Sequence, residues 1–270
     1  MPRILIILPQ TDFDPSEVAL PWLVWTQAGH EVCFATETGQ PATCDPVTLT
    51  GQGLPLFARS LQARVEAREA YAAMLEDRNY GRPLRWTKVR PSSFDAFHFP
   101  GGHAPGMRSY CESDAVQQLA HDAFRANKPV SAVCHGVLPL ARAGVLIGRR
   151  TTALTEPLEK IAIQLTRAAL PGHYRTYPKT VEAEVKHRIR PGGMFERGGM
   201  FPRYAGRRNP EAGFVVQDGN YLSARWPGDA WTLALRLNAL LAKLAADTQP
   251  GECDEAGSHV SACRDRGDRG

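Results

Sequence analysis

The hydrophobic pattern at the start of the chain predicts a strand, a helix and a second strand. Residues 3–8, "RILIIL", form a continuous apolar run, which is typical of a strand buried on both faces of a parallel sheet. The next segment, "DPSEVALPWLVWTQAGHE", predicts a helix, because Asp14 can cap it, Pro15 suits its first position and Gly29 can end it. Residues 31–36, "EVCFAT", predict the second strand.

The same alternation returns after residue 93. "FDAFHFPGG" predicts a strand followed by a glycine turn, residues 113–128 a capped amphipathic helix, and "PVSAVC" the next strand. A helix closed by Gly144, a strand "TTALT" and a helix at about 156–169 follow. Strands that alternate with helices in this way predict an α/β fold with a doubly wound, mostly parallel sheet and helices on both faces.

Two long segments interrupt the alternation. Residues 37–93 join a Gly- and Pro-rich stretch to a charged helical run, so we expect a helical insertion or cap. Residues 171–212 are rich in Arg, Pro and Gly and predict an irregular basic excursion. "GFVVQDGNYLSARW" then predicts a hairpin and "PGDAWTLALRLNALLAKLAA" the last helix. We therefore expect one domain over residues 1–245 and a disordered tail over 246–270.

Composition and charge narrow the class of protein. The chain has 270 residues, of which 43% are hydrophobic, enough for a full core. Its net charge of +4 is too small to indicate a nucleic-acid binder. The first apolar run is too short for a signal peptide or a membrane span, so we expect a cytoplasmic protein that does not bind membranes. The six cysteines show no CxxC spacing, which favours reduced thiols.

The stretch "PVSAVCHG", residues 129–136, carries the main candidate for chemistry. Cys134 ends a predicted strand, and ligands of open α/β folds bind at the carboxyl ends of strands. A helix that begins near His135 would lower the thiol pKa with its positive end and offer amides to an oxyanion. The alternative is a small buried cysteine that packs as a hydrophobic residue.

Two other features fall on the same rim of the predicted sheet. "FPGGHAPG", residues 99–106, has paired glycines that allow a main-chain amide to approach a reacting atom, so Gly102 is an oxyanion-hole candidate. Glu17 lies in the first turn of the first helix, after the first strand. The alternatives are an ordinary glycine turn and a favourable partner of the helix dipole.

Taken together, "SEVALP", "PGGH", "AVCHG" and "LSARWPGDA" resemble the ThiJ/PfpI superfamily, whose fold is the flavodoxin-like one of class I glutamine amidotransferases. The resemblance extends over nearly all of residues 1–245. The insertion before "HFPGG" is similar to the larger branch that contains glyoxalase III and holding chaperones. The elbow "AVCHG" and the later "ARWPG" depart from the GxCxG and His-x-Glu pattern of true glutamine amidotransferases, which disfavours glutaminase chemistry.

The resemblance implies a role for each matching residue. Cys134 would be the nucleophile at a strained elbow, and Glu17 a protonated partner of its sulfur and a general acid/base. The amides of Gly102 and His135 would form the oxyanion hole, and the His135 side chain would accept or relay a proton. The family often places an acid that orients this histidine at Glu156. We expect Glu156 in that role, with Glu159 as its substitute; the alternative is an ordinary acid at a helix start.

The pocket residues expected around this centre are Gly101, His103 and Trp226, although His103 can equally cap its loop and Trp226 can equally pack. The metal-binding histidines of some large-branch chaperones are not recognisable, so no metal is expected. The resemblance also implies a homodimer.

Three functions remain open at this point. The first is a glyoxalase III-like conversion of a 2-oxoaldehyde to a 2-hydroxy acid, in which a thiolate adds to the aldehyde and no cofactor is needed. The second is a holding chaperone or an oxidation-sensing stress protein. The third is a pathway-specific lyase, hydratase or hydrolase whose anionic substrate is recruited by the basic excursion, which holds nine Lys or Arg against three Glu between Arg175 and Arg208.

Overall fold

A seven-stranded sheet forms the centre of the computed structural model, which describes residues 1–199 and 201–247. The strand order is β10-β11-β7-β6-β1-β3-β5, and every neighbouring pair is parallel except β10 with β11. These strands are β1 (Arg3–Ile7), β3 (Glu31–Thr36), β5 (Leu84–Arg85), β6 (Ala96–Phe99), β7 (Val130–Val133), β10 (Val215–Asp218) and β11 (Tyr221–Ala224).

The first strand lies in the middle of this sheet because its side chains are apolar on both faces. Ile4 to Ile7 have no exposed surface. Ile4 lies opposite Val32 of β3 and Ala96 of β6, so strands from distant parts of the chain flank β1 on both sides. This arrangement confirms the predicted doubly wound, mostly parallel α/β fold.

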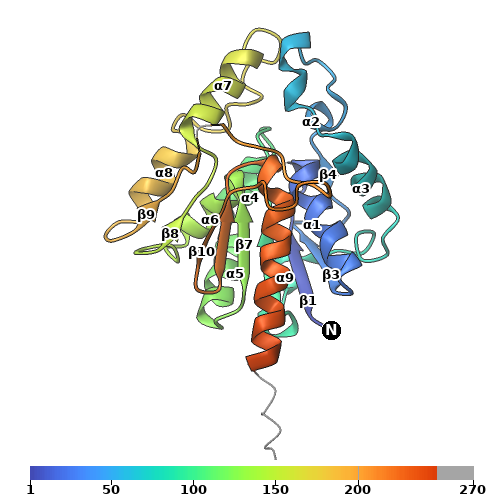
Figure 1. Cartoon of the computed structure of the whole chain (residues 1–270), viewed down its shortest axis with the longest axis vertical. Coiled ribbons are helices and arrows are strands. Elements are labelled where there is room, and N and C mark those ends of the chain that lie inside the picture. The colour runs from blue at the N-terminus through green and yellow to red at the C-terminus, as the bar shows by residue number, and fades with distance from the viewer. Residues whose placement is uncertain (200, 248–270) are drawn as a thin grey trace, which may run out of the picture.

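Helices cover both faces of the sheet (Figure 1). On one face α1 (Pro15–Gln27) packs against α9 (Ala230–Asp247), and Trp25 donates a hydrogen bond of 3.0 Å to the Ala234 carbonyl. α3 (Val65–Leu75) packs against α1. The helices of the other face are α4 (Met107–Glu112), α5 (Asp114–Arg125), α6 (Val137–Arg142) and α8 (Val181–Arg188).

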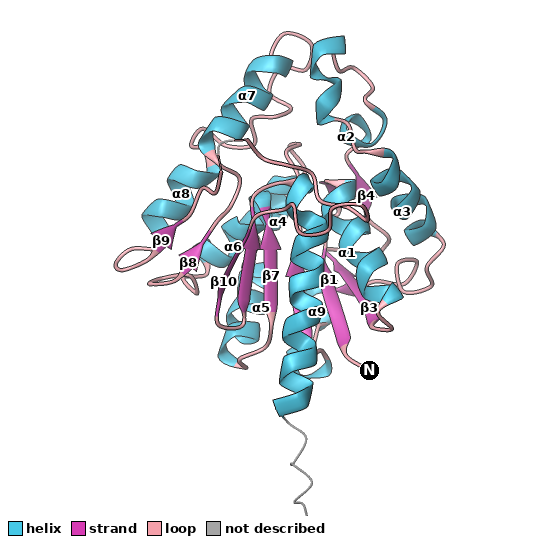
Figure 2. Ribbon diagram, in the orientation of Figure 1, coloured by secondary structure: helices cyan, strands magenta, loops and turns pink. Residues whose placement is uncertain are grey.

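An arch of helices stands above the carboxyl ends of the parallel strands (Figure 2). It is made by α2 (Pro46–Thr50), the 3₁₀ helix η1 (Leu56–Leu61) and α7 (Glu156–Thr166). A small apolar cluster of Leu54, Ala58, Ala162 and Tyr174 holds the two sides of the arch together. The arch therefore has its own core, separate from the main one.

The remaining elements are short. Two small parallel sheets pair β2 (Thr11–Phe13) with β4 (Thr43–Cys44) and β8 (Arg150–Thr151) with β9 (Met194–Phe195). The other 3₁₀ helices are η2 (Trp86–Lys88), η3 (Pro91–Ser93), η4 (Cys134–Gly136) and η5 (Pro227–Asp229).

Three sequence predictions differ from the structure. Residues 37–93 are not only a cap, because β5 extends the main sheet and α3 packs against α1. The strand predicted at "TTALT" is reduced to Thr151, which pairs with β9 outside the main sheet since β10 already occupies the edge beside β11. Residues 171–212 are not irregular throughout, because they contain α8 and β9.

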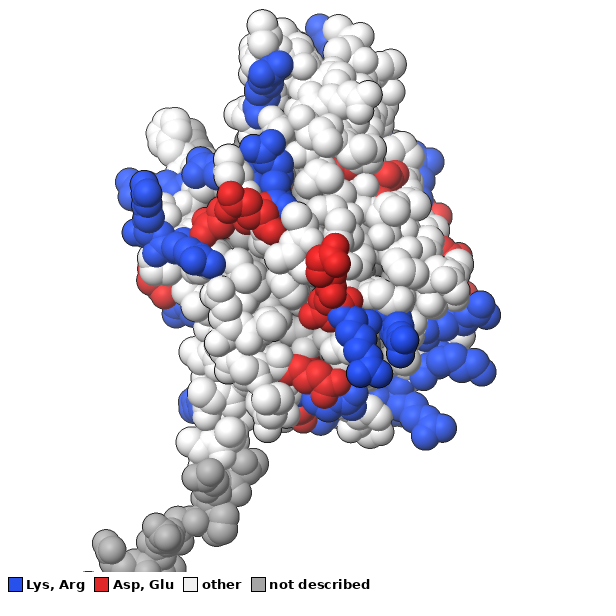
Figure 3. Space-filling model, turned by 90° about the vertical axis from the view of Figure 1, so that its right-hand side faces the viewer, with Lys and Arg blue, Asp and Glu red and all other residues white. Residues whose placement is uncertain are grey.

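The predicted tail, 246–270, falls almost wholly outside the described residues, and α9 extends to Asp247. No helix among the described residues is long and apolar enough to cross a membrane. Figure 3 shows one face of the molecule, on which Lys and Arg side chains are interspersed with Asp and Glu side chains.

Candidate active site

Cys134 lies at a sharp turn between a strand and a helix. Strand β7 ends in extended backbone at Val133, and Cys134 follows with a φ of 56° before α6 begins at Val137. A left-handed φ costs a residue other than glycine about 1–2 kcal/mol, so packing must hold the cysteine in this conformation. The side chain has no exposed surface. The turn therefore presents a strained, enclosed thiol at the carboxyl end of β7.

Glycine at two positions allows the turn after β6 to pack closely against this elbow. A Cβ at Gly136 would overlap with the main-chain carbonyl oxygen of Phe99. At Gly101 a Cβ would lie only 2.7 Å from the His135 nitrogen and 2.9 Å from Glu17 Oε2. Both positions therefore require glycine because of close contact.

Glu17 reaches the elbow from the first turn of α1. Asp14 caps this helix by accepting a hydrogen bond of 2.8 Å from the Ser16 amide, and its own amide donates to the Gly101 carbonyl. Glu17 Oε2 in turn accepts a hydrogen bond of 2.8 Å from the Gly101 amide. Burial, together with the charge of Asp14, raises the pKa of Glu17 well above its ordinary value. Burial therefore favours the protonated form of this carboxyl group.

Two imidazole rings face the thiol. The Cys134 sulfur lies 3.6 Å from His135 Nδ1 and 3.9 Å from His103 Nε2, and the two rings meet edge to face at 5.2 Å. Burial lowers the pKa of His103 to about 4 and that of His135 well below its ordinary value. Both rings are therefore neutral at pH 7, and each can accept a proton.

The thiol itself does not have the lowered pKa that the helix start predicts. Burial raises the pKa of Cys134 well above its ordinary value, and the hydrogen bond from the His135 amide opposes this only in part. The lowered thiol pKa expected from the helix start is therefore not found, because desolvation outweighs the effect of the helix end. Proton transfer to a neighbouring group has to accompany any attack by the sulfur.

Only one of the two amides predicted to form the oxyanion hole is found beside the thiol. The His135 amide faces the thiol, as its hydrogen bond to the sulfur requires. Gly102 packs on the other side of its turn, where a Cβ would meet Met107 and the main chain of Asp12 and Asp14. The glycine next to the elbow is Gly101, and Glu17 already binds its amide. The role of the Gly102 amide stays a prediction.

The structure does not bring Glu156 to His135. Its carboxylate lies 2.5 Å from Lys160 Nζ and 4.0 Å from Arg197, at the start of α7. His135 Nε2 is buried and has no hydrogen-bond partner among the described residues. The sequence placed Glu156 at the end of a strand of the main sheet, and the loss of that strand removes the reason for its position near the histidine.

Glu159, the predicted substitute, is buried one turn further along α7. Its Oε2 accepts a hydrogen bond of 2.8 Å from the Val181 amide, and burial raises its pKa to about 7. It makes no hydrogen bond to His135. Neither predicted acid therefore orients the ring.

A cavity of about 260 Å³ lies beside His103, under the arch. His103 and Trp226, both expected at the pocket, line it, whereas Gly101 does not. The ring of Trp226 lies 4.5 Å from that of Tyr204, a second lining residue. No Lys or Arg is among the described residues that line this cavity, so the basic excursion supplies no cation to an anionic substrate there.

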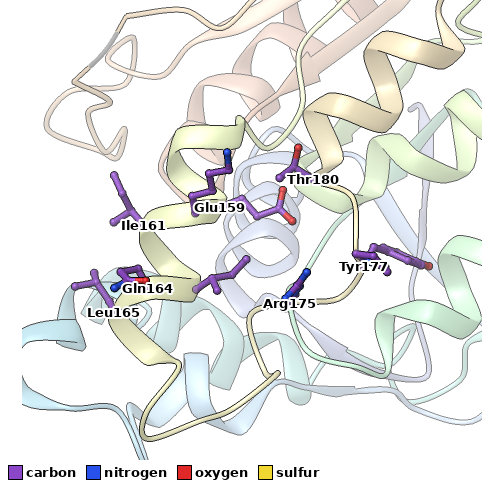
Figure 4. A pocket seen from close by; sticks show the side chains of 10 residues that line it. Glu159, Ile161, Gln164, Leu165, Arg175, Tyr177 and Thr180 are labelled. Atoms are coloured by element: carbon purple, nitrogen blue, oxygen red, sulfur yellow. The ribbon is translucent and has the colours of Figure 1, made fainter.

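A larger hollow of about 640 Å³ also borders α7 (Figure 4). It includes Glu159, Arg175 and Tyr177 but neither Cys134 nor its two histidines. Of the two, only the smaller cavity is lined by a residue in contact with the thiol, His103, although Cys134 itself does not line it.

Two residues of the site, Asp14 and Tyr174, were not predicted from the sequence to belong to it. Asp14, expected only as a helix cap, also lines the cavity, and burial raises its pKa to about 7. Tyr174 packs against His103 with ring centroids 5.2 Å apart. It comes from the excursion, whose path no periodic pattern predicts. Within residues 1–199 and 201–247, no group of His, Cys, Asp or Glu is suited to hold a metal ion.

A buried cysteine at a strand-to-helix elbow, with an acid from the first helix beside it, places the chain in a class of α/β proteins that carry a cysteine at this turn. Within this class the chain belongs to the ThiJ/PfpI-like family, whose model matches residues 8–189. The family that the sequence motifs resemble is thereby confirmed.

Curated relatives and solved structures agree with this assignment. A deglycase of Pyrococcus horikoshii is 31% identical over 150 residues, which are 55% of this chain and 70% of that protein. Protein/nucleic acid deglycase 2 of Escherichia coli is 28% identical over 57% of this chain and 72% of its own length. Glyoxalase III of Candida albicans has the same fold, with a TM-score of 0.62, 20% identity and coverage of 88% of this chain and 96% of that one.

Proposed function

We propose that this protein is a cysteine-dependent enzyme that converts a 2-oxoaldehyde to the corresponding 2-hydroxy acid without a separate cofactor. The observation that carries the proposal is the position of the Cys134 sulfur next to the buried Glu17 carboxyl group and two neutral imidazoles, one of which, His103, lines a cavity. The names of the relatives, deglycase and glyoxalase III, favour carbonyl chemistry over the other reactions of a thiol.

The first step is the addition of the thiol to the aldehyde. As the sulfur bonds to the aldehyde carbon, His135 Nδ1 takes the thiol proton, because it is the nearer of the two neutral rings at 3.6 Å. The carbonyl oxygen becomes the oxygen of a hemithioacetal and is hydrogen-bonded by the His135 amide. The protonated Glu17 adds no negative charge to this oxyanion.

The second step moves a proton between the two substrate carbons. A base removes the proton from the former aldehyde carbon to give an enediol, and the proton returns at the neighbouring carbon. His135 first gives the thiol proton to the hemithioacetal oxygen and then, as a neutral base again, removes the carbon proton, while Glu17 donates its proton to the neighbouring carbonyl oxygen. The thioester forms when His135 returns the proton to that carbon and Glu17 takes one back from the hydroxyl group on the first carbon. The product is a thioester of the 2-hydroxy acid, and one water molecule hydrolyses it to the free acid and the Cys134 thiol. The net reaction is addition of one water, with no electron donor or acceptor.

The test is product formation from methylglyoxal and from larger 2-oxoaldehydes by the purified protein in the presence of a chelator. Chromatography should show the 2-hydroxy acid in stoichiometric amount with the aldehyde consumed. Consumption of the aldehyde without this acid would contradict the proposal.

The names of the relatives favour a second candidate, the removal of carbonyl adducts from proteins or nucleic acids. The same thiol would attack a hemiaminal or hemithioacetal adduct instead of the free aldehyde. Release of hydroxy acid from preformed adducts, at a rate above that set by their spontaneous dissociation, separates this activity from the first.

A holding chaperone stays the alternative without turnover, and exposed Leu56 and Phe57 of η1 are where it would bind its clients. The homodimer and the pathway-specific lyase stay predictions.

A further inference from the structure

We infer that the substrate of this site carries a bulky apolar group, an aromatic ring or a branched hydrocarbon chain, on the carbon next to the aldehyde. The inference rests on the proposed function and names its substrate class. An arylglyoxal such as phenylglyoxal is the simplest member of this class, and methylglyoxal lies outside it.

The wall of the cavity under the arch is apolar over most of its area. α7 contributes Leu158, Ile161 and Leu165 to one side, and Tyr204 and Trp226 form another. None of the described residues that line it is Lys or Arg. Apolar groups gain binding free energy from such a wall in proportion to the area they bury, and charged groups lose hydration there without a partner.

The size of the cavity also exceeds what a methyl group fills. Its volume is about 260 Å³. A cavity of about 150 Å³ is enough for a benzene molecule in a protein interior. A phenyl group therefore fits with room for the two carbonyl groups, whereas a methyl group would leave most of the wall without contact.

The cavity meets the thiol at His103, and this contact sets the direction in which a substrate lies. His103 lines the cavity, and its Nε2 is 3.9 Å from the Cys134 sulfur. Asp14, the N-cap of the helix that carries Glu17, also lines the cavity. The dicarbonyl end has to lie at His103 to reach the sulfur, and the apolar group extends along the rest of the wall.

Turnover of two aldehydes by matched variants tests the inference. The wild type should have kcat/KM for phenylglyoxal at least about 10 times that for methylglyoxal. Leu158→Ser should reduce this ratio at least about tenfold. Ile163→Ser is the control, because Ile163 lies on the same helix but lines the outer hollow instead of the cavity, and it should leave the ratio unchanged. A wild-type ratio of one or less, or equal effects of the two variants, would overturn the inference.

A binding measurement keeps this result separate from the success of the proposed function. Calorimetry on the Cys134→Ala protein compares 1-phenyl-1,2-ethanediol with 1,2-propanediol, neutral compounds that cannot react with a thiol. Tighter binding of the phenyl compound, lost on adding Leu158→Ser but not Ile163→Ser, supports the apolar substrate even if neither aldehyde is turned over. Turnover of both aldehydes with no preference in either measurement leaves the reaction standing and contradicts the substrate class.

Discussion

At the scale of single residues, the site depends on where its protons are. Burial raises the pKa of both Glu17 and Cys134, so acid and thiol both carry protons at rest. The same burial keeps His135 and His103 neutral. The thiol therefore loses its proton to an imidazole when a carbonyl arrives, and Glu17 must remain uncharged for a negative sulfur to exist beside it.

Replacing Glu17 tests its part in proton transfer. Gln can still accept the hydrogen bond from the Gly101 amide and is uncharged like the protonated acid, but it cannot exchange a proton. We expect Glu17→Gln to lower kcat by about 100-fold or more while the free energy of unfolding changes by about 1 kcal/mol or less. Steady-state kinetics and urea unfolding measure the two. An active Glu17→Gln protein would mean that the acid only shapes the turn.

The buried carboxyl group of Glu159 should make the free energy of unfolding depend on pH. Its pKa in the folded protein is about 7, above the usual 4.5, so the folded state holds the proton more tightly than the unfolded chain. The resulting stability is complete below pH 4.5 and is lost as the pH rises through 7. Since Gln cannot ionise, Glu159→Gln should be more stable than the wild type at pH 8, by roughly 1–3 kcal/mol. The two proteins should be equally stable at pH 4. If the two proteins differed in stability by the same amount at pH 4 and pH 8, the raised pKa of Glu159 would be contradicted.

The sequence indicated some of these residues and not others. Cys134, Glu17 and His103 follow predicted strands or begin the first helix, so their common rim follows from the α/β pattern. The pKa of the Cys134 thiol could not be predicted from this pattern. It depends on burial, and burial depends on which segments cover the carboxyl ends of the strands. Glu156 was misplaced since its position rested on a strand that the main sheet does not contain.

At the scale of elements, the elbow and the turn after β6 fit together only through their glycines. Gly136 has a φ of −62°, which alanine adopts freely, so the obstacle to a side chain is contact with the main chain of Phe99 and Pro100. At Gly144 the situation is reversed, because its φ is 76° and the nearest atom to a Cβ is 3.8 Å away.

Alanine at these two positions should therefore have different effects. Gly136→Ala has to displace main chain and should cost about 3 kcal/mol or more of unfolding free energy. Gly144→Ala should cost about 1–2 kcal/mol, from its backbone conformation alone. Chemical denaturation of both variants measures this. Equal, small losses would mean that the turn after β6 yields easily and does not define the elbow.

The segments with a clear apolar run or helix cap predicted their elements well. The runs that became β1, β3, β6 and β7 are apolar, those that became α1 and α5 carry helix caps, and the predicted hairpin is formed by β10 and β11. Two-residue strands such as β5 and β8 have no period to detect. Their partners are decided by which sheet edge is free, a property of the assembled fold.

At the scale of the whole molecule, the shape of the cavity depends on the parts of the chain that the sequence could not place. The cavity takes Leu61 from the insertion, Leu158 from α7, and Tyr174 and Tyr204 from the excursion. The ion pair of Asp45 with His173, at 3.0 Å, ties the insertion to the excursion over the rim. The predicted core therefore determines the rim of the sheet that carries Cys134. Tertiary contacts between irregular segments determine the shape of the cavity.

The central claim is that one thiol of this molecule performs the chemistry. Cys134→Ala removes it, and Cys111→Ala removes another fully buried, free thiol as a control. With 2-oxoaldehyde as substrate, the rate of hydroxy acid formation should fall about 1,000-fold or more in Cys134→Ala and stay within about threefold of wild type in Cys111→Ala. Circular dichroism establishes that both are folded. A folded Cys134→Ala protein that forms the acid at the wild-type rate would contradict the account.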